Sequence, residues 1–193
     1  MLNAGFASTN CCGVMSCKLI IYPFGFIINL QSFLARKIGI NISAKKGDIL
    51  TVICENMGRA NFGPKMMRKK GIAGRVLIDG KIHFNWNVYP MPMSNLEKLV
   101  YTEKDIEENS IFLRGTFTPD DIADTFIKLD NFTKGFVVIN GFNIGRYWEI
   151  GPQQTLYVPA DLLKKGENEI IIFESDKLKG EPVVKFTDTP ILG

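Results

Sequence analysis

The sequence contains little of what catalysis and metal binding usually require. Its 193 residues include one histidine, His83, and no G-x-S-x-G motif that would mark an activated serine. The four cysteines include Cys11, Cys12 and Cys17, but this spacing without a distant second pair is not that of a zinc site. We therefore predict free thiols in a reducing compartment, no metal and no cofactor. His83 is interpreted as a surface or cross-strand residue rather than a catalytic base.

Long hydrophobic runs and a large excess of one charge are also missing. The most apolar stretch, residues 19–30, has twelve residues and is interrupted by Pro23 and Gly25, whereas a membrane-crossing helix needs about 20. A pair of buried strands, bent where these two residues lie, is the expected structure. The formal net charge of +3 is too small to indicate nucleic-acid binding, and the basic cluster at residues 65–70 is interpreted as a solvated loop. Without a spanning segment, we expect a soluble, cytoplasmic protein, with neither a membrane nor a nucleic acid as a partner.

What the sequence does contain is strand and turn signals, which are clearest in its last third. Residues 136–139 form a short apolar, β-branched run, and the dipeptide Asn140-Gly141 follows it. This dipeptide tolerates the two positive φ angles of a type I′ hairpin turn. Residues 143–148 are therefore the expected return strand.

Further strands show the same pattern of short apolar runs bounded by turn residues. We expect them at residues 112–117, 125–129, 155–158, 170–173 and 183–186, with at most one helical turn at residues 161–165. Gly145 and Arg146, inside the return strand, are expected to hold the hairpin against the turn at Gly151-Pro152. Strands and turns without long helices indicate an all-β protein.

An internal repeat indicates two related β-domains. Residues 45–55 and 164–174 each contain two lysines, a glycine, an acid and an apolar run that ends in glutamate. We expect Gly47 and Gly166 to adopt positive φ angles in a turn that leads into a buried strand.

A hairpin and a proline-rich crossover follow the first copy of the repeat. Residues 75–88 are expected to form two strands around the turn at Asp79-Gly80, with residues 84, 86 and 88 facing one side. Residues 89–93, Tyr-Pro-Met-Pro-Met, are unsuited to a central strand and mark a crossover. The expected organisation is a diverged segment at residues 1–40, a partial first β-sandwich at 41–93, and a C-terminal β-sandwich at 94–193.

Three blocks of sequence carry a more specific signal. They are NGFNIGRYW at residues 140–148, GPQQTLYVP at residues 151–159, and ENMGRANFG at residues 55–63. The first two resemble the last β-sandwich domain of the glycoside hydrolase family 35 β-galactosidases, and the third resembles the end of the preceding β-domain. The resemblance covers the chain from about residue 45 onward and fails over the first forty or so residues. It implies a jelly-roll β-sandwich of the galactose-binding-like type, with part of a second β-sandwich before it.

The resemblance also implies a parent activity that this chain is not expected to perform alone. Family 35 enzymes remove terminal β-D-galactosyl residues in a (β/α)₈ barrel, a fold that needs about 250 residues. The chain has 193 residues and no strand–helix alternation, and no two acids are paired by their spacing as a two-carboxyl mechanism requires. We predict a non-catalytic C-terminal part that supports the barrel or shapes its mouth. Its expected partners are galactosides and a barrel that is encoded separately or lost.

Arg59, Asn61 and Phe62 are the first candidates for sugar binding. They lie in the third block, where a tight loop presents a guanidinium fork and an amide. The resemblance implies that this loop looks toward the barrel mouth, with Phe62 nearest the sugar. The alternative is that Arg59 braces a domain interface by binding backbone carbonyls or Glu55.

Tyr147 and Trp148 are the other candidates, because aromatic faces bind the apolar faces of pyranose rings. Neighbouring residues of a strand point to opposite sides, so at most one of them lines a surface, and Trp148 is favoured as a core residue. A rival hypothesis is an independent carbohydrate-binding module that acts through one of these rings. A small glycosidase with relocated carboxylates is a third.

Overall fold

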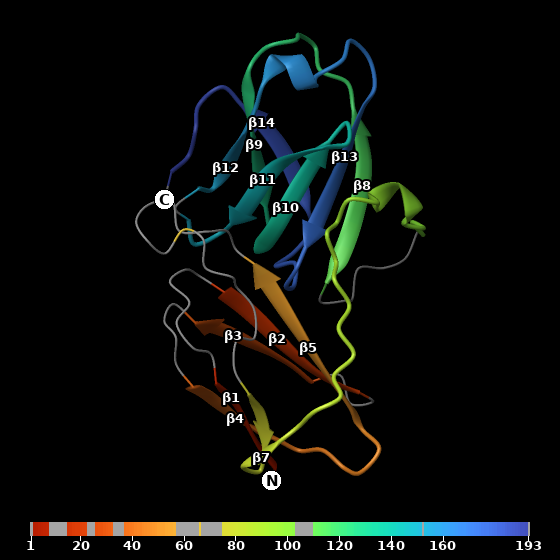
Figure 1. Cartoon of the computed structure of the whole chain (residues 1–193). Helices are drawn as coiled ribbons and strands as arrows, with labels where there is room; N and C mark the ends of the chain where they lie inside the picture. The colour runs from red at the N-terminus through yellow and green to blue at the C-terminus, as the bar shows by residue number, and fades with distance from the viewer. Residues whose placement is uncertain are drawn as a thin grey trace. The chain divides into compact units, whose positions relative to one another are not determined.

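The computed structural model describes residues 2–7, 15–22, 26–32, 37–56, 66, 75–102, 110–151 and 153–192. These residues form antiparallel strands and two short 3₁₀-helices (Figure 1), which confirms the predicted all-β class. The chain divides into two compact units, Met1–Met91 and Pro92–Gly193. This division falls inside the proline-rich stretch at residues 89–93.

The described residues of the first unit form two antiparallel sheets. Its strands are β1 (Leu2–Ala7), β2 (Met15–Tyr22), β3 (Phe26–Ser32), β4 (Lys37–Ile42), β5 (Ile49–Asn56), β6 (Val76–Ile78) and β7 (Lys81–Ile82). One sheet has the order β4-β1-β6-β7 and the other β3-β2-β5. The strand pair predicted over residues 19–30 is β2 with β3, in which Leu19 pairs with Ile28. The predicted bend between them lies outside the described residues.

The repeated turn leads into a strand in both units. Gly47 has a φ angle of 102° and Gly166 one of 101°, which residues with a side chain rarely adopt. In the first copy the backbone N–H of Asp48 donates to the carbonyl oxygen of Lys45 at 3.1 Å, and the Asp48 carboxylate accepts the backbone N–H of Lys45 at 2.7 Å. The predicted glycine conformation is confirmed in both copies.

The predicted hairpin at residues 75–88 is shorter than expected. Asp79 and Gly80 have the positive φ angles of the predicted turn, 49° and 74°. The return strand β7 nevertheless ends at Ile82. Just past it, the backbone N–H of His83 donates to the carbonyl oxygen of Val76, the first residue of β6, at 3.1 Å.

The segment after β7 does not form the predicted strand or its shared face. Phe84 and Val88 are 76% and 82% exposed, and Asn85 has a φ angle of 60°, which interrupts an extended run. The indole N–H of Trp86 donates to the carbonyl oxygen of His83 at 3.0 Å. His83 is exposed and follows β7 instead of lying on a strand.

The second unit is a β-sandwich, as predicted. Its elements are η1 (Leu96–Lys98), β8 (Ile111–Phe117), β9 (Thr125–Asp130), β10 (Lys134–Ile139), β11 (Phe142–Trp148), β12 (Thr155–Val158), η2 (Ala160–Leu162), β13 (Asn168–Glu174) and β14 (Val183–Thr187). One sheet has the order β11-β10-β13-β8 and the other β12-β9-β14. Every strand expected in this unit is present, with ends within two residues of the predicted bounds. In the described part of the chain, no helix is long and apolar enough to cross a membrane.

The core of the second unit lies between its two sheets. The buried side chains that meet there come from both sheets: Ile127, Val137, Ile139, Tyr147, Leu156, Val158, Ile170 and Ile172. On the other face of β10, Phe136 and Val138 are also buried and pack with Leu96 of η1. Because β10 is covered on both faces, its last four residues, 136–139, form a continuous apolar run instead of alternating with polar ones.

Candidate functional site

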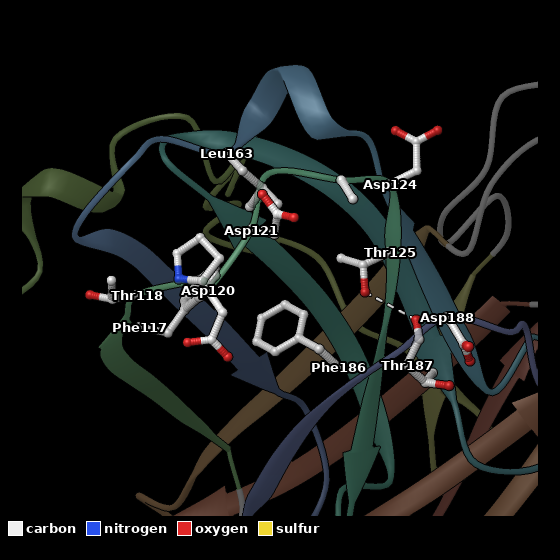
Figure 2. A pocket seen from close by; sticks show the side chains of 12 residues that line it. Phe117, Thr118, Asp120, Asp121, Asp124, Thr125, Leu163, Phe186, Thr187 and Asp188 are labelled. Carbon is white, nitrogen blue, oxygen red and sulfur yellow. Dashed lines mark hydrogen bonds between the residues drawn. The ribbon is translucent and has the colours of Figure 1, made fainter.

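An open cleft of about 410 Å³ lies in the second unit (Figure 2). Three segments form its walls: the loop between β8 and β9, the residue after η2, and the end of β14. The lining residues are Phe117, Thr118, Pro119, Asp120, Asp121, Ala123, Asp124, Thr125, Leu163, Phe186, Thr187 and Asp188. The cleft therefore lies where strands of both sheets begin or end.

Phe117 and Phe186 form the apolar surface of the cleft. Side chains two residues apart share a face of a strand, and Leu113 on β8 and Val184 on β14 pack against the core. Both phenylalanines therefore continue the inward-facing side of their strands. Their ring centroids are 4.7 Å apart with planes tilted by 38°. Phe186 is 41% exposed, so part of its ring is open to solvent at the mouth of the sandwich.

Carboxylates surround this aromatic pair. Asp120, Asp121 and Asp124 come from the loop after β8, and Asp188 follows β14 (Figure 2). Asp121 Oδ1 accepts the backbone N–H of Ile122 at 3.2 Å. Among the described residues, no lysine or arginine lines the cleft. The cleft thus offers oxygen acceptors to hydroxyl groups and repels anions.

Asp124 fixes one wall of the cleft. Its Oδ1 accepts the backbone N–H of Ala160 at 2.9 Å, and its carboxylate accepts the hydroxyl of Tyr157. These two hydrogen bonds favour the ionised form and lower the pKa of Asp124 below its ordinary value. The same contact with the anion raises the pKa of the Tyr157 phenol. The loop after β8 is thereby tied to β12 and η2.

A second hydrogen bond fixes the opposite wall. The hydroxyl of Thr125, the first residue of β9, donates to the carbonyl oxygen of Thr187 at 3.0 Å, the bond drawn dashed in Figure 2. It extends the pairing of β9 with β14 to the edge of the cleft, beside Phe186. Both walls are therefore held in place by the protein itself.

The predicted turn residues lie at the tip of the β10–β11 hairpin and do not line the cleft. Asn140 and Gly141 have φ angles of 49° and 83°, as a type I′ turn requires. The side-chain amide of Asn140 donates to the carbonyl oxygen of Leu162 at 2.7 Å, and its oxygen accepts the backbone N–H of Glu169 at 3.1 Å. Asn140 therefore connects the hairpin to η2 and β13.

Gly145 and Arg146 lie next to an irregularity in the pairing of β10 with β11. Gly145 has a φ angle of 131°, and its N–H donates to Asn143 Oδ1 at 2.9 Å. The register shifts between Val137 and Val138 opposite this point, and Arg146 pairs with Phe136. The turn that this pair was expected to contact includes Pro152, which lies outside the described residues.

Tyr147 and Trp148 do not line the cleft either. Tyr147 is 4% exposed, and its ring packs edge-on against Phe132 with centroids 5.9 Å apart. The ring has no face to offer a sugar in this arrangement. Trp148 is half-buried, and the Nζ atom of Lys134 lies 6.0 Å from its ring centroid. The sequence favoured Trp148 as the core residue, whereas the structure buries Tyr147 more deeply.

The other predicted sugar-binding residues lie outside the described residues. They are Arg59, Asn61 and Phe62.

Glu174 is a fully buried carboxylate whose environment the sequence did not reveal. It accepts the backbone N–H of Thr133 at 2.7 Å, the hydroxyl of Thr133 at 2.5 Å and the backbone N–H of Asp176 at 2.8 Å. The hydroxyl of Tyr147 lies 3.2 Å from its Oε2 atom. Charge-assisted hydrogen bonds of this kind offset the cost of burying a carboxylate.

Nowhere in the described residues do three or more histidines, cysteines or acids gather as metal ligands.

Two family models match this chain. The β-galactosidase first all-beta domain matches residues 27–92, and the β-galactosidase galactose-binding domain matches residues 110–168. The matched segments are β-domains of the β-galactosidase type. The first match begins inside the segment 1–40, over which the sequence resemblance failed.

Curated relatives are β-galactosidases and proteins named as similar to them. Beta-galactosidase 1 of Dictyostelium discoideum is 37% identical over 153 residues, which are 73% of this chain and 22% of the relative. Beta-galactosidase of Bos taurus is 35% identical over 192 residues, which are 83% of this chain and 29% of the relative. Beta-galactosidase-1-like protein 2 of Homo sapiens is 36% identical over 153 residues, which are 75% of this chain and 24% of the relative. The chain thus spans about a quarter of the length of these relatives.

The cleft falls largely within the galactose-binding domain. Residues 117–125 and Leu163 lie inside the match at residues 110–168. Phe186 and Asp188 follow the matched segment and complete the cleft from β14.

Proposed function

We propose that this chain is a non-catalytic part of a β-galactosidase, and that it supports the catalytic barrel or shapes its mouth. The parent enzyme hydrolyses terminal β-D-galactosyl residues. The observation that carries the proposal is that both family matches, in the order of the parent family, are to β-domains and not to a barrel.

The size of the chain and the environment of its buried acid also support this role. A (β/α)₈ barrel needs about 250 residues, and this chain has 193. Retaining glycosidases need two carboxyl groups about 5–5.5 Å apart and open to the substrate. Glu174 is fully buried and already accepts several hydrogen bonds, so it is unsuited to act as an acid or a nucleophile.

Hydrolysis of a nitrophenyl β-galactoside by the purified chain tests the proposal. We expect no turnover above that of buffer. Turnover that disappears on substitution of one aspartate or glutamate would show a relocated active site and contradict the proposal. The genomic sequence before the gene provides a second test, since we expect a barrel-encoding segment, in frame or frameshifted, close to it.

The cleft favours a second candidate function, galactoside binding by this chain without a barrel. An aromatic ring open to solvent and several carboxylates form one cavity, most of whose lining residues lie within the segment that matches the galactose-binding domain. Calorimetry with galactose and lactose tests this function, which requires saturable heat. The cytoplasmic location remains a prediction.

A further inference from the structure

The cleft joins an apolar surface to polar acceptors, which is the combination that a pyranose ring requires. One face of galactopyranose presents C–H groups, and its edge presents hydroxyl groups. Phe186 and Phe117 supply the aromatic surface, with 41% of Phe186 exposed. Ligand sites of this kind combine a mostly apolar lining with a few polar groups that fix the orientation of the ligand.

The carboxylates around Phe186 are placed to accept hydrogen bonds from hydroxyl groups. Asp120 and Asp121 lie on the loop after β8 and Asp188 lies beyond β14, so acceptors stand on two sides of the ring (Figure 2). Hydrogen bonds to a charged acceptor are stronger than those between neutral groups. Because no cationic side chain lines the cleft among the described residues, a neutral sugar suits it better than an acidic one.

Two hydrogen bonds hold the walls of the cleft. Asp124 accepts the backbone N–H of Ala160 on one side, and Thr125 donates to Thr187 on the other. A site that is already ordered loses less conformational freedom on binding. These bonds connect the loop after β8 to η2 and the start of β9 to the end of β14.

We propose that the cleft is a binding site for a neutral galactoside, whose apolar face stacks on Phe186 and whose hydroxyl groups donate to Asp120 and Asp188. This inference rests on the second candidate function, galactoside binding by the chain itself. It moves the sugar contact from Tyr147 and Trp148 to residues that the sequence did not single out. Phe186 is the stacking residue, and the two aspartates determine specificity.

Nuclear magnetic resonance titration of the ¹⁵N-labelled chain with galactose tests the site. We expect shifts confined to residues 117–125 and 186–188. Phe186→Ala is expected to weaken binding about tenfold, and Asp188→Asn several-fold, since tenfold corresponds to about 1.4 kcal/mol. The matched control is Phe142→Ala, which removes a ring that is 57% exposed at the hairpin tip and outside the cleft. Galacturonate, the anionic analogue, is expected to bind more weakly than galactose.

Each outcome decides between the claims. Saturable binding that survives Phe186→Ala, or shifts centred on Trp148, would overturn the cleft as the site while leaving galactoside binding intact. No saturable shift with galactose or lactose would overturn both binding claims but not the role as a non-catalytic part. A calcium titration without sugar that saturates at Asp120 and Asp188 would identify a cation site and overturn the proposal. The unfolding midpoint of each variant in urea separates loss of binding from loss of fold.

Discussion

The side chains of Asn140 and Asn168 are hydrogen-bonded to each other, with the amide nitrogen of Asn140 2.8 Å from Oδ1 of Asn168. Asn168 is fully buried. Its own amide nitrogen donates to the carbonyl oxygens of Lys164 and Gly166, each at 2.9 Å. The pair therefore joins the hairpin tip, the turn after η2 and the start of β13. Because that turn includes Leu163, which lines the cleft, the pair also holds part of a cleft wall.

Replacement of Asn168 by alanine is expected to destabilise the second unit by about 2–3 kcal/mol, because it leaves several buried polar groups without partners. Urea unfolding followed by tryptophan fluorescence measures the change. Asn95→Ala is the matched control, since Asn95 is exposed and its side chain does not cap η1. We expect the control to stay within about 0.5 kcal/mol of the parent. Equal losses in the two variants would contradict the assigned role of Asn168.

The strands and turns of the second unit could be predicted because their signals are local. Asn140-Gly141 specifies its turn through backbone angles that few other residues adopt, and the repeated glycines at positions 47 and 166 do the same. The strand predicted through residue 88 failed for the opposite reason. Alternating side chains at Phe84 and Val88 favour a strand, but a strand also needs a paired neighbour. Among the described residues, the backbone pairing of this segment with β6 stops at His83.

The cleft and the buried carboxylate could not be predicted, because both depend on residues far apart in the sequence. Phe117 and Phe186 meet only because β8 and β14 end at the same edge of the sandwich. Glu174 receives two of its donors, the backbone N–H and the hydroxyl of Thr133, from a segment about 40 residues earlier. A glutamate at the end of a strand carries no local sign of burial. Which of Tyr147 and Trp148 is the more deeply buried likewise depends on which side of β11 faces the core.

The buried carboxylate is expected to contribute to stability through its hydrogen bonds. Glu174→Gln keeps the size of the side chain but turns an amide toward donors such as the backbone N–H of Thr133. We expect a loss of about 2–3 kcal/mol in the free energy of unfolding, measured by urea titration at pH 7. The control is Glu167→Gln at an exposed position in the turn before β13, for which we expect little change. A neutral effect of the Glu174 variant would mean that its donors find other acceptors.

Gly135 is expected to tolerate no side chain. A Cβ atom there would stand 1.6 Å from the carbonyl oxygen of Phe173 and 2.8 Å from the hydroxyl of Tyr147. Backbone atoms of a central strand cannot move aside cheaply, so Gly135→Ala is expected to abolish cooperative unfolding of this unit. Gly141→Ala is the contrasting variant, because the space around it is open and only its φ angle of 83° is unfavourable. We expect it to cost about 1 kcal/mol. Circular dichroism during heating distinguishes the two outcomes.

The contact between Asp124 and Tyr157 is expected to link stability to pH at both ends of the scale. The pKa of Asp124 is lowered from 3.8, first by the Ala160 N–H and then by Tyr157. Its contribution is therefore present above the unfolded pKa and lost as the pH falls through the folded value. The pKa of Tyr157 is raised from 10.0 by the hydrogen bond to Asp124, so that contribution is lost as the pH rises through the folded value. Carbon-detected magnetic resonance titrations measure the effect of Tyr157→Phe, which we expect to raise the pKa of Asp124. The control is Asp130, whose pKa is lowered by Lys185 and Lys128 and should not change in this variant. If Asp124 titrates identically in both proteins, the hydroxyl does not bind it in solution.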